Sequence, residues 1–158
     1  MKFIADRMLE RLARWLRLFG YDTSGIKKQE NEDDTLLELA QSEGRILISR
    51  DEALIRRAVK KGIRAYLVSS PDIIEQLWEI QKEFNIKFEP VMDRCSLCNS
   101  PIRKVEPSEM ELVRNKDYVY PARLESGTEF WLCDKCGQVY WQGKHWENIM
   151  GTARKYFQ

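Results

Sequence analysis

Two CxxC pairs constrain the fold of this chain more than any other feature of its sequence. Its four cysteines are Cys95, Cys98, Cys133 and Cys136. Two residues between cysteines allow one tight turn to direct both thiolates at a single ion. Asn99 and Gly137, residue types that tolerate a positive φ, follow the second cysteine of each pair. Two such turns facing each other form a closed tetrahedral four-sulfur site, so we predict a structural zinc ion there.

The pairs have other interpretations, since each CxxC could be a redox motif or the four thiols could be unrelated. In a reducing compartment, paired CxxC spacing favours metal over lasting disulfides. A closed site keeps no ligand position for water, so we expect the zinc to stabilise a module with few aliphatic runs and not to catalyse.

Residues 3–90 alternate short apolar runs with longer stretches of helical periodicity. The apolar runs predict strands at residues 3–5, 45–50 and 65–68, and the periodic stretches predict helices at 8–19, 33–44, 52–61 and 73–84. Strands and helices that alternate at this spacing are typical of βαβ units. We therefore predict a three-layered α/β domain with a parallel sheet.

The character of the sequence changes after Pro90. The helical pattern is no longer evident, and prolines and short aromatic runs accompany the cysteines. We therefore predict an α/β domain at residues 1–90, followed by a small four-cysteine zinc ribbon at residues 91–158.

The charge balance excludes a protein that is basic overall. The net charge is +1, with 16 basic and 16 acidic side chains in residues 1–90, and 10 and 9 in residues 91–158. Contacts with a polyanion would therefore depend on local patches. No apolar run approaches the roughly 20 residues that span a bilayer, and the N-terminus lacks a signal-peptide pattern. We expect a cytoplasmic protein with no membrane partner.

Acidic residues directly follow two of the predicted strands. Asp6 follows the first strand and Asp51 the second, while Asp33 and Asp34 open a helix. Because the carboxyl ends of parallel strands lie at one edge of a sheet, we expect Asp6 and Asp51 to converge, and the acidic doublet could approach the same edge. Clustered carboxylates repel one another unless a cation neutralises them, and their oxygens suit Mg²⁺ or Mn²⁺.

A cation held by these carboxylates would favour phosphodiester hydrolysis. It would orient the phosphate, lower the pKa of the attacking water and stabilise the leaving oxygen. The alternative is structural, because each of these aspartates also stands where a helix N-cap is expected. Spacing alone leaves both interpretations open.

The first predicted helix carries its arginines on the arc opposite its apolar side chains. These arginines are Arg7, Arg11, Arg14 and Arg17. Arginine binds phosphate in a bidentate manner and the helix begins beside Asp6, so these residues, together with Arg50, are candidate phosphate contacts. The alternative is a solvated helix face on which Glu10 pairs with Arg14.

Aromatic and basic residues alternate near the C-terminus. Trp131, Tyr140, Trp141 and Trp146 occur close to Lys144 and His145. Such a pattern can stack the bases of single-stranded RNA, or it can form the small core of the ribbon. The only histidine, His145, is either a substrate-binding or catalytic residue or a packed structural one.

Several motifs, in order, resemble the Mut7-C ribonuclease family. They are FIADRML at residues 3–9, LARWLR at 12–17, GYD at 20–22 and GRILISRD at 44–51, joined by Asp33 with its following leucines, both CxxC pairs and GQVYWQGKHW at 137–146. The resemblance covers nearly the whole chain. It implies a PIN-like nuclease domain fused to a zinc ribbon, and RNA cleavage with a divalent ion held by Asp6, Asp33 and Asp51. Asp34 is a rival for the middle position.

We therefore predict a hydrolase: a Mg²⁺- or Mn²⁺-dependent endoribonuclease acting on single-stranded regions of RNA. The alternative is an inactive member that binds RNA or a ribonucleoprotein through the ribbon and the helix arginines. A third possibility is a toxin-like nuclease with one particular RNA target.

Overall fold

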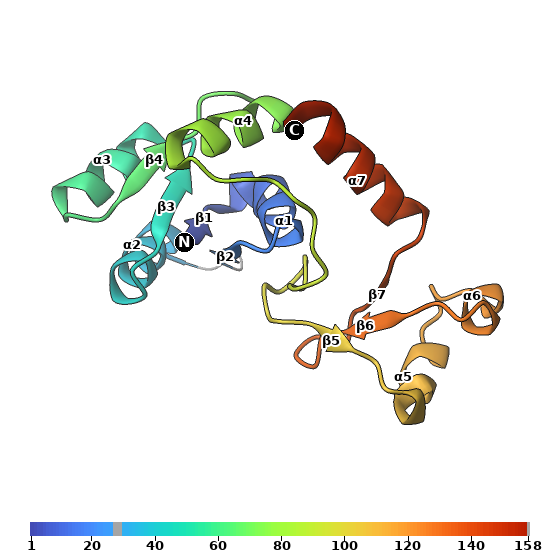
Figure 1. The fold of residues 1–158 in the computed structure, drawn as a ribbon. Coiled ribbons are helices and arrows are strands. Elements are labelled where there is room, and N and C mark those ends of the chain that lie inside the picture. Colours follow the sequence, from blue (N-terminus) through green and yellow to red (C-terminus); the bar gives the residue numbers. More distant parts are fainter. Residues whose placement is uncertain (27–29, 158) are drawn as a thin grey trace.

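The predicted apolar runs form three strands of a four-stranded parallel sheet in the computed structural model, which describes residues 1–26 and 30–157 (Figure 1). The strands are β1 (Lys2–Ala5), β2 (Asp22–Gly25), β3 (Ile46–Ser49) and β4 (Ala65–Leu67). Their order is β2-β1-β3-β4, so β1 lies between β2 and β3. In the register of these pairs, Phe3 lies opposite Thr23 and Ala5 opposite Ile48.

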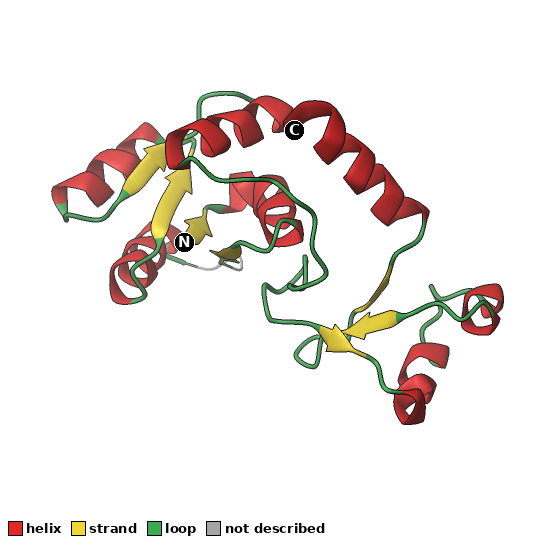
Figure 2. Ribbon diagram, in the orientation of Figure 1, coloured by secondary structure: helices red, strands yellow, loops and turns green. Residues whose placement is uncertain are grey.

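Helices cover both faces of this sheet (Figure 2). They are α1 (Glu10–Leu18), which follows a 3₁₀ turn at Arg7–Leu9, α2 (Glu32–Ser42), α3 (Glu52–Lys60) and α4 (Ile73–Phe84). Because successive side chains of a strand point to opposite faces, Phe3 packs against α1 and α4, whereas Ile4 packs against α2 and α3. The three-layered α/β class is therefore confirmed.

One strand of the sheet, β2, is not predicted from the sequence. β2 reads Asp-Thr-Ser-Gly and contains no apolar run. It is a strand because its backbone pairs with β1 along all four residues, which is a tertiary contact that its own composition does not signal.

The cysteine-bearing part contains a second, antiparallel sheet in the order β5-β6-β7. Its strands are β5 (Arg103–Lys104), β6 (Phe130–Leu132) and β7 (Val139–Trp141), with a 3₁₀ turn at Pro107–Glu109 and short helices α5 (Met110–Arg114) and α6 (Pro121–Glu125) between β5 and β6. A small separate core includes Val113, Phe130 and Val139. The expectation that helices end at Pro90 is wrong, because α5, α6 and a long C-terminal helix follow it.

That helix, α7 (Lys144–Phe157), runs from the antiparallel sheet back to α4, beside which the C-terminus lies (Figure 1). Ala153 and Phe157 join the core of the parallel sheet, and the indole N–H of Trp78 donates to the carbonyl of Tyr156 at 2.8 Å. The two parts therefore share apolar contacts across the predicted boundary. The division into residues 1–90 and 91–158 stays a prediction.

No helix in the described ranges is long and apolar enough to cross a membrane.

The packing of α7 predicts that its last turn stabilises the parallel sheet. Phe157 contacts Phe88 and Phe19 edge-on, with ring centroids 5.2 and 6.1 Å apart. Replacing a buried phenylalanine by alanine costs about 3–5 kcal/mol, so for the half-buried Phe157 we expect Phe157→Ala to lower the free energy of unfolding by about 1–3 kcal/mol in urea titrations.

The exposed Arg154 on the same helix is the control, and Arg154→Ala should change the free energy of unfolding little. Equal stability of the two variants would show that α7 is not part of this core.

Candidate functional site

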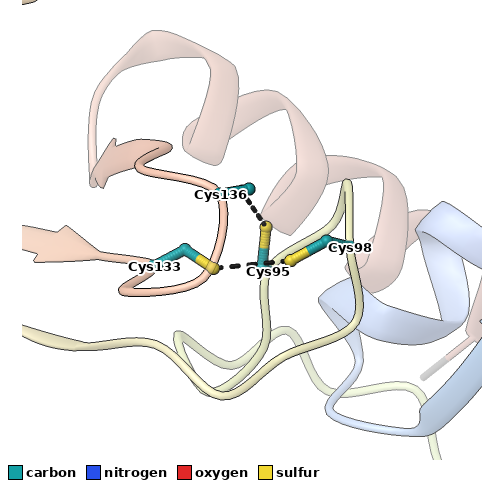
Figure 3. Close-up of side chains that lie close together, drawn as sticks. All are labelled: Cys95, Cys98, Cys133 and Cys136. Atoms are coloured by element: carbon teal, nitrogen blue, oxygen red, sulfur yellow. Dashed lines mark hydrogen bonds between the residues drawn. The ribbon is translucent and has the colours of Figure 1, made fainter.

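The four cysteines converge from two turns that are far apart in the sequence (Figure 3). Cys95 Sγ lies 3.5 Å from Cys136 Sγ, and Cys98 Sγ lies 3.4 Å from Cys133 Sγ. All four sulfur atoms lie within 4.8 Å of one another. A tetrahedral ion with Zn–S bonds of about 2.3 Å needs sulfurs roughly 3.8 Å apart, so the cluster could hold a metal such as zinc.

The two turns have the same backbone geometry. Asn99 N–H donates to the carbonyl of Cys95 at 2.9 Å, and Gly137 N–H donates to that of Cys133 at 2.8 Å. Asn99 has φ 68° and Gly137 has φ 75°. The predicted positive φ after each CxxC is therefore confirmed, and both turns direct their thiols to one point.

The thiols of this cluster differ in pKa: burial raises the pKa of Cys133 and raises that of Cys136 to about 12, whereas the pKa of Cys98 is lowered. Burial alone would raise the pKa of Cys98, but hydrogen bonds with the backbone and side chain of Ser100 outweigh it and lower the pKa to about 6. The hydroxyl of Tyr140 lies 3.0 Å from Cys95 Sγ and accepts from the Ser96 N–H at 3.1 Å. Its proton is therefore free to point at the sulfur, which stabilises the negative charge that a metal ligand carries.

Asp6 and Asp51 lie at the carboxyl ends of the adjacent strands β1 and β3, as predicted, and Ser49 links them. The hydroxyl of Ser49 donates to Asp6 Oδ2 and accepts from the Asp51 N–H at 2.9 Å. Ser49 is fully buried, whereas Asp51 is exposed. One side chain therefore fixes the position of both aspartates at this edge.

Both carboxylates also cap helices, which is the alternative that the sequence left open. Asp6 Oδ1 accepts from the Leu9 N–H at 3.2 Å, and Asp51 Oδ1 accepts from Ala53 and Leu54 at 2.8 and 3.1 Å. Each aspartate therefore has a structural role as a helix cap. The second carboxylate oxygen of Asp6, Oδ2, accepts the hydrogen bond from Ser49 at the end of β3.

The acidic doublet that opens α2 is bound by an arginine of α3. Arg57 pairs with Asp34 and, at 3.4 Å, with Asp33. All three side chains are substantially exposed. The guanidinium group of Arg57 therefore neutralises the doublet in the way that a metal ion would.

Within residues 1–26 and 30–157, the cysteines are the only group of three or more His, Cys, Asp or Glu side chains whose ligand atoms all lie within 4.8 Å of one another. Three carboxylates therefore do not meet at that distance. Asp6 and Asp51 are neighbours through Ser49, and the doublet is engaged with Arg57.

The helix arginines have different surroundings. Arg7 pairs with Glu32 at 3.3 Å and Arg14 with Glu10 at 3.4 Å, the latter being the pair expected of a solvated helix face. Arg11 and Arg50 are exposed, and neither forms an ion pair with a described residue. Of the arginines predicted to contact phosphate, these two therefore have no carboxylate partner within the described residues.

Arg17 does not lie on a solvated arc, and that expectation is wrong. Its side chain is only 3% exposed and donates to backbone carbonyls of Thr23, Ser96 and Leu97. A helical wheel identifies the side of a helix but not what covers that side, so the sequence could not predict this burial.

The aromatic and histidine residues singled out in the C-terminal part also differ in their exposure. Trp131 is buried and Trp141 packs against the small core of the antiparallel sheet, as their core interpretation requires. His145 is exposed in the first turn of α7. Its role stays a prediction.

Sequence reasoning missed two contacts of the site. The first is the link that the Ser49 hydroxyl makes between Asp6 and Asp51, for which the position of Ser49 at the end of a buried strand is the available signal. The pairing of Arg57 with the doublet has no local signal, because the partners come from different helices.

The family model described as Mut7-C RNAse domain matches residues 1–153 of the chain. No curated protein and no solved structure matches.

The cysteine geometry predicts one tightly bound zinc ion per chain. We expect Cys133→Ser to abolish zinc retention after dialysis, because Cys133 is buried and a four-sulfur site that loses one ligand loses its closed geometry. Elemental analysis measures the ratio of zinc to protein.

Ser126→Ala, an exposed change in the same part of the chain, should leave that ratio at one. Full zinc content in the Cys133→Ser variant would contradict the assignment of the ligands.

Proposed function

The chain belongs to the Mut7-C RNAse domain family, and we propose that it is a metal-dependent endoribonuclease whose site is the β1–β3 edge. The family match indicates a ribonuclease-related role with RNA as the substrate. The finer assignments of metal, residues and mode of cleavage are our proposal.

The link of Asp6 to Asp51 through Ser49 is the observation that carries this proposal. The Ser49 hydroxyl is fully buried between the ends of β1 and β3. It donates to the carboxylate of Asp6 and accepts from the backbone N–H of Asp51. This arrangement supports a site preorganised for a cation, since the supporting hydrogen bonds leave Asp51 Oδ2 and the solvent-facing side of the edge available.

Each residue of the edge then has a role in hydrolysis. Asp6 and Asp51 would hold Mg²⁺ or Mn²⁺, which would activate water and stabilise the leaving oxygen when bound. Arg11 and Arg50, exposed and without an ion-pair partner among the described residues, would contact the RNA phosphates, as would Arg7 and Arg14 after release from their carboxylates.

The acidic doublet would supply the third carboxylate. Asp34 forms the shorter contact with Arg57, so its charge is already compensated, whereas Asp33 lies 3.4 Å from the same guanidinium. A cation that binds Asp33 would therefore replace the longer of the two contacts with Arg57. Arg57 would be free to contact phosphate once the cation is bound.

The remaining predictions concern the second part of the chain. We propose that residues 91–158 form a zinc ribbon, with zinc in a structural role, that presents single-stranded RNA or a ribonucleoprotein partner to the edge formed by residues 1–90. His145, exposed at the start of α7, is a candidate contact on this route.

A specific observation favours a second function. Both edge aspartates cap helices and the doublet is paired with Arg57, so no carboxylate trio lies ready in the described part of the chain. A member that binds RNA without cleaving it would have this arrangement. It predicts RNA binding that weakens steeply with salt and shows no turnover with added Mn²⁺.

The proposed site predicts that Asp6→Asn and Asp51→Asn each lower the rate of Mn²⁺-dependent RNA cleavage by at least roughly 100-fold. Asparagine still caps a helix, so the fold should persist while the charge that holds the cation is lost. Gel assays of a labelled single-stranded RNA measure the rate.

Asp72 provides a matched control. Its N–H donates to the Ser70 hydroxyl at 3.0 Å and its carboxylate caps α4, which repeats the geometry of Ser49 and Asp51 without Asp6. Asp72→Asn should retain activity. Wild-type cleavage by both edge variants would refute the site.

The doublet gives a separate prediction. We expect Asp33→Asn to reduce Mn²⁺-dependent cleavage more than Asp34→Asn, because the latter carboxylate serves mainly as the partner of Arg57. Titration of the cleavage rate with Mn²⁺ should show a raised half-saturating concentration for Asp33→Asn. The reverse order would assign Asp34 to the site.

A further inference from the structure

The outer side of β2 is closed by side chains where a further strand would otherwise pair. β2 is an edge strand, and such strands usually expose unpaired backbone groups. At Thr23, which is fully buried, the N–H donates to Asn99 Oδ1 at 2.9 Å and the carbonyl accepts from Arg17 Nε at 2.7 Å. Both groups of this residue are therefore satisfied from outside the sheet.

Both of these side chains also connect β2 to the first cysteine turn. Arg17 Nη1 donates to the carbonyls of Ser96 and Leu97, the two residues between Cys95 and Cys98, at 2.9 and 3.3 Å. Arg17 therefore spans from the sheet edge to the inside of the turn that directs two thiols at the metal position.

Asn99 makes the second connection. It follows Cys98 directly, and its amide Nδ2 donates to Asp22 Oδ1 at 2.7 Å. Asp22 in turn pairs with Arg45 at 2.6 Å. The turn is thus fastened to two successive residues of β2 by one side chain.

A comparison of the two cysteine turns indicates what the side chain of Asn99 does. Gly137 occupies the equivalent position of the second turn with nearly the same φ, so the turn itself needs no side chain there. An asparagine at φ 68° is less favourable than glycine. The asparagine stands only in the turn that faces β2, where its amide group makes the contacts with Thr23 and Asp22.

The charge of Arg17 also indicates a link between this side chain and the metal cluster. The Arg17 side chain is 3% exposed, and among the described residues its carboxylate partner is Glu10, at 3.3 Å, whose side chain is 40% exposed. A divalent ion with four thiolates carries a net charge of −2, so a loaded cluster places negative charge beside this buried cation. The anionic metal–thiolate cluster and the guanidinium group of Arg17 therefore stabilise each other.

We propose that Arg17 and Asn99 couple metal binding at the four cysteines to the edge of the parallel sheet. Metal loading orders β2 and the C-terminal half of α1, and by linkage Arg17 and Asn99 strengthen metal binding. Both are positioning residues, and the coupling does not depend on RNA cleavage. It applies to this chain's fold whether or not the proposed nuclease site is active.

Hydrogen exchange of the full chain, with zinc bound and after chelation, tests this coupling. We expect chelation to speed exchange in residues 14–25 as well as in 92–100, and to leave α3 at 52–60 unchanged. In the zinc-loaded state, Asn99→Gly and Arg17→Gln should both speed exchange in residues 22–25. Competition with a chromogenic chelator should show zinc affinity lowered by about 10-fold.

Asn99→Gly is the decisive variant if Arg17→Gln does not fold, because glycine keeps the turn conformation and removes only the amide group. Arg56→Gln, an exposed change in α3, is the control and should match the wild type. Unchanged zinc affinity together with unchanged exchange of residues 22–25 in the Asn99→Gly variant would overturn the proposal.

Discussion

Parallel pairing of β1 with both β2 and β3 is the constraint on which the rest of the structure depends. The register that places Ala5 opposite Ile48 brings the next residues, Asp6 and Ser49, into contact at one edge. The register that places Phe3 opposite Thr23 turns the backbone of Thr23 toward the first cysteine turn. One central strand thus positions the candidate catalytic edge and the anchor of the metal cluster.

The two regions manage charge in opposite ways. At the β1–β3 edge, the carboxylates of Asp6 and Asp51 accept from a hydroxyl and from helix N-termini, and a divalent cation can supplement these partners. At the cysteine cluster, the positive charge of Arg17 is buried, and its partners are Glu10 and backbone carbonyls, including two of the first cysteine turn. The first arrangement suits the exchangeable cation that we propose for catalysis. The second suits the structural metal that we propose for the cysteines.

The sequence predicts features that are local or that show buried periodicity. The metal turns follow from spacing because two residues and a positive φ suffice to build them, and the helices of residues 1–90 follow from apolar faces. α7 also had a readable signal in Trp146, Ile149, Ala153 and Phe157, whose spacing is helical, but the cysteines and prolines before it masked that signal. β2 and the burial of Arg17 depend on residues distant in sequence, so neither could be predicted.

We propose that Asp6 and Asp51 form a divalent-cation site, and Mn²⁺ binding to the zinc-loaded chain tests this proposal. Electron paramagnetic resonance reports free Mn²⁺, so binding appears as a loss of signal. The account predicts one bound Mn²⁺ per wild-type chain and per Asp72→Asn chain, with at least roughly 10-fold weaker binding in Asp6→Asn, since removing one carboxylate removes a hard oxygen ligand. Equal binding by the wild type and Asp6→Asn would contradict it.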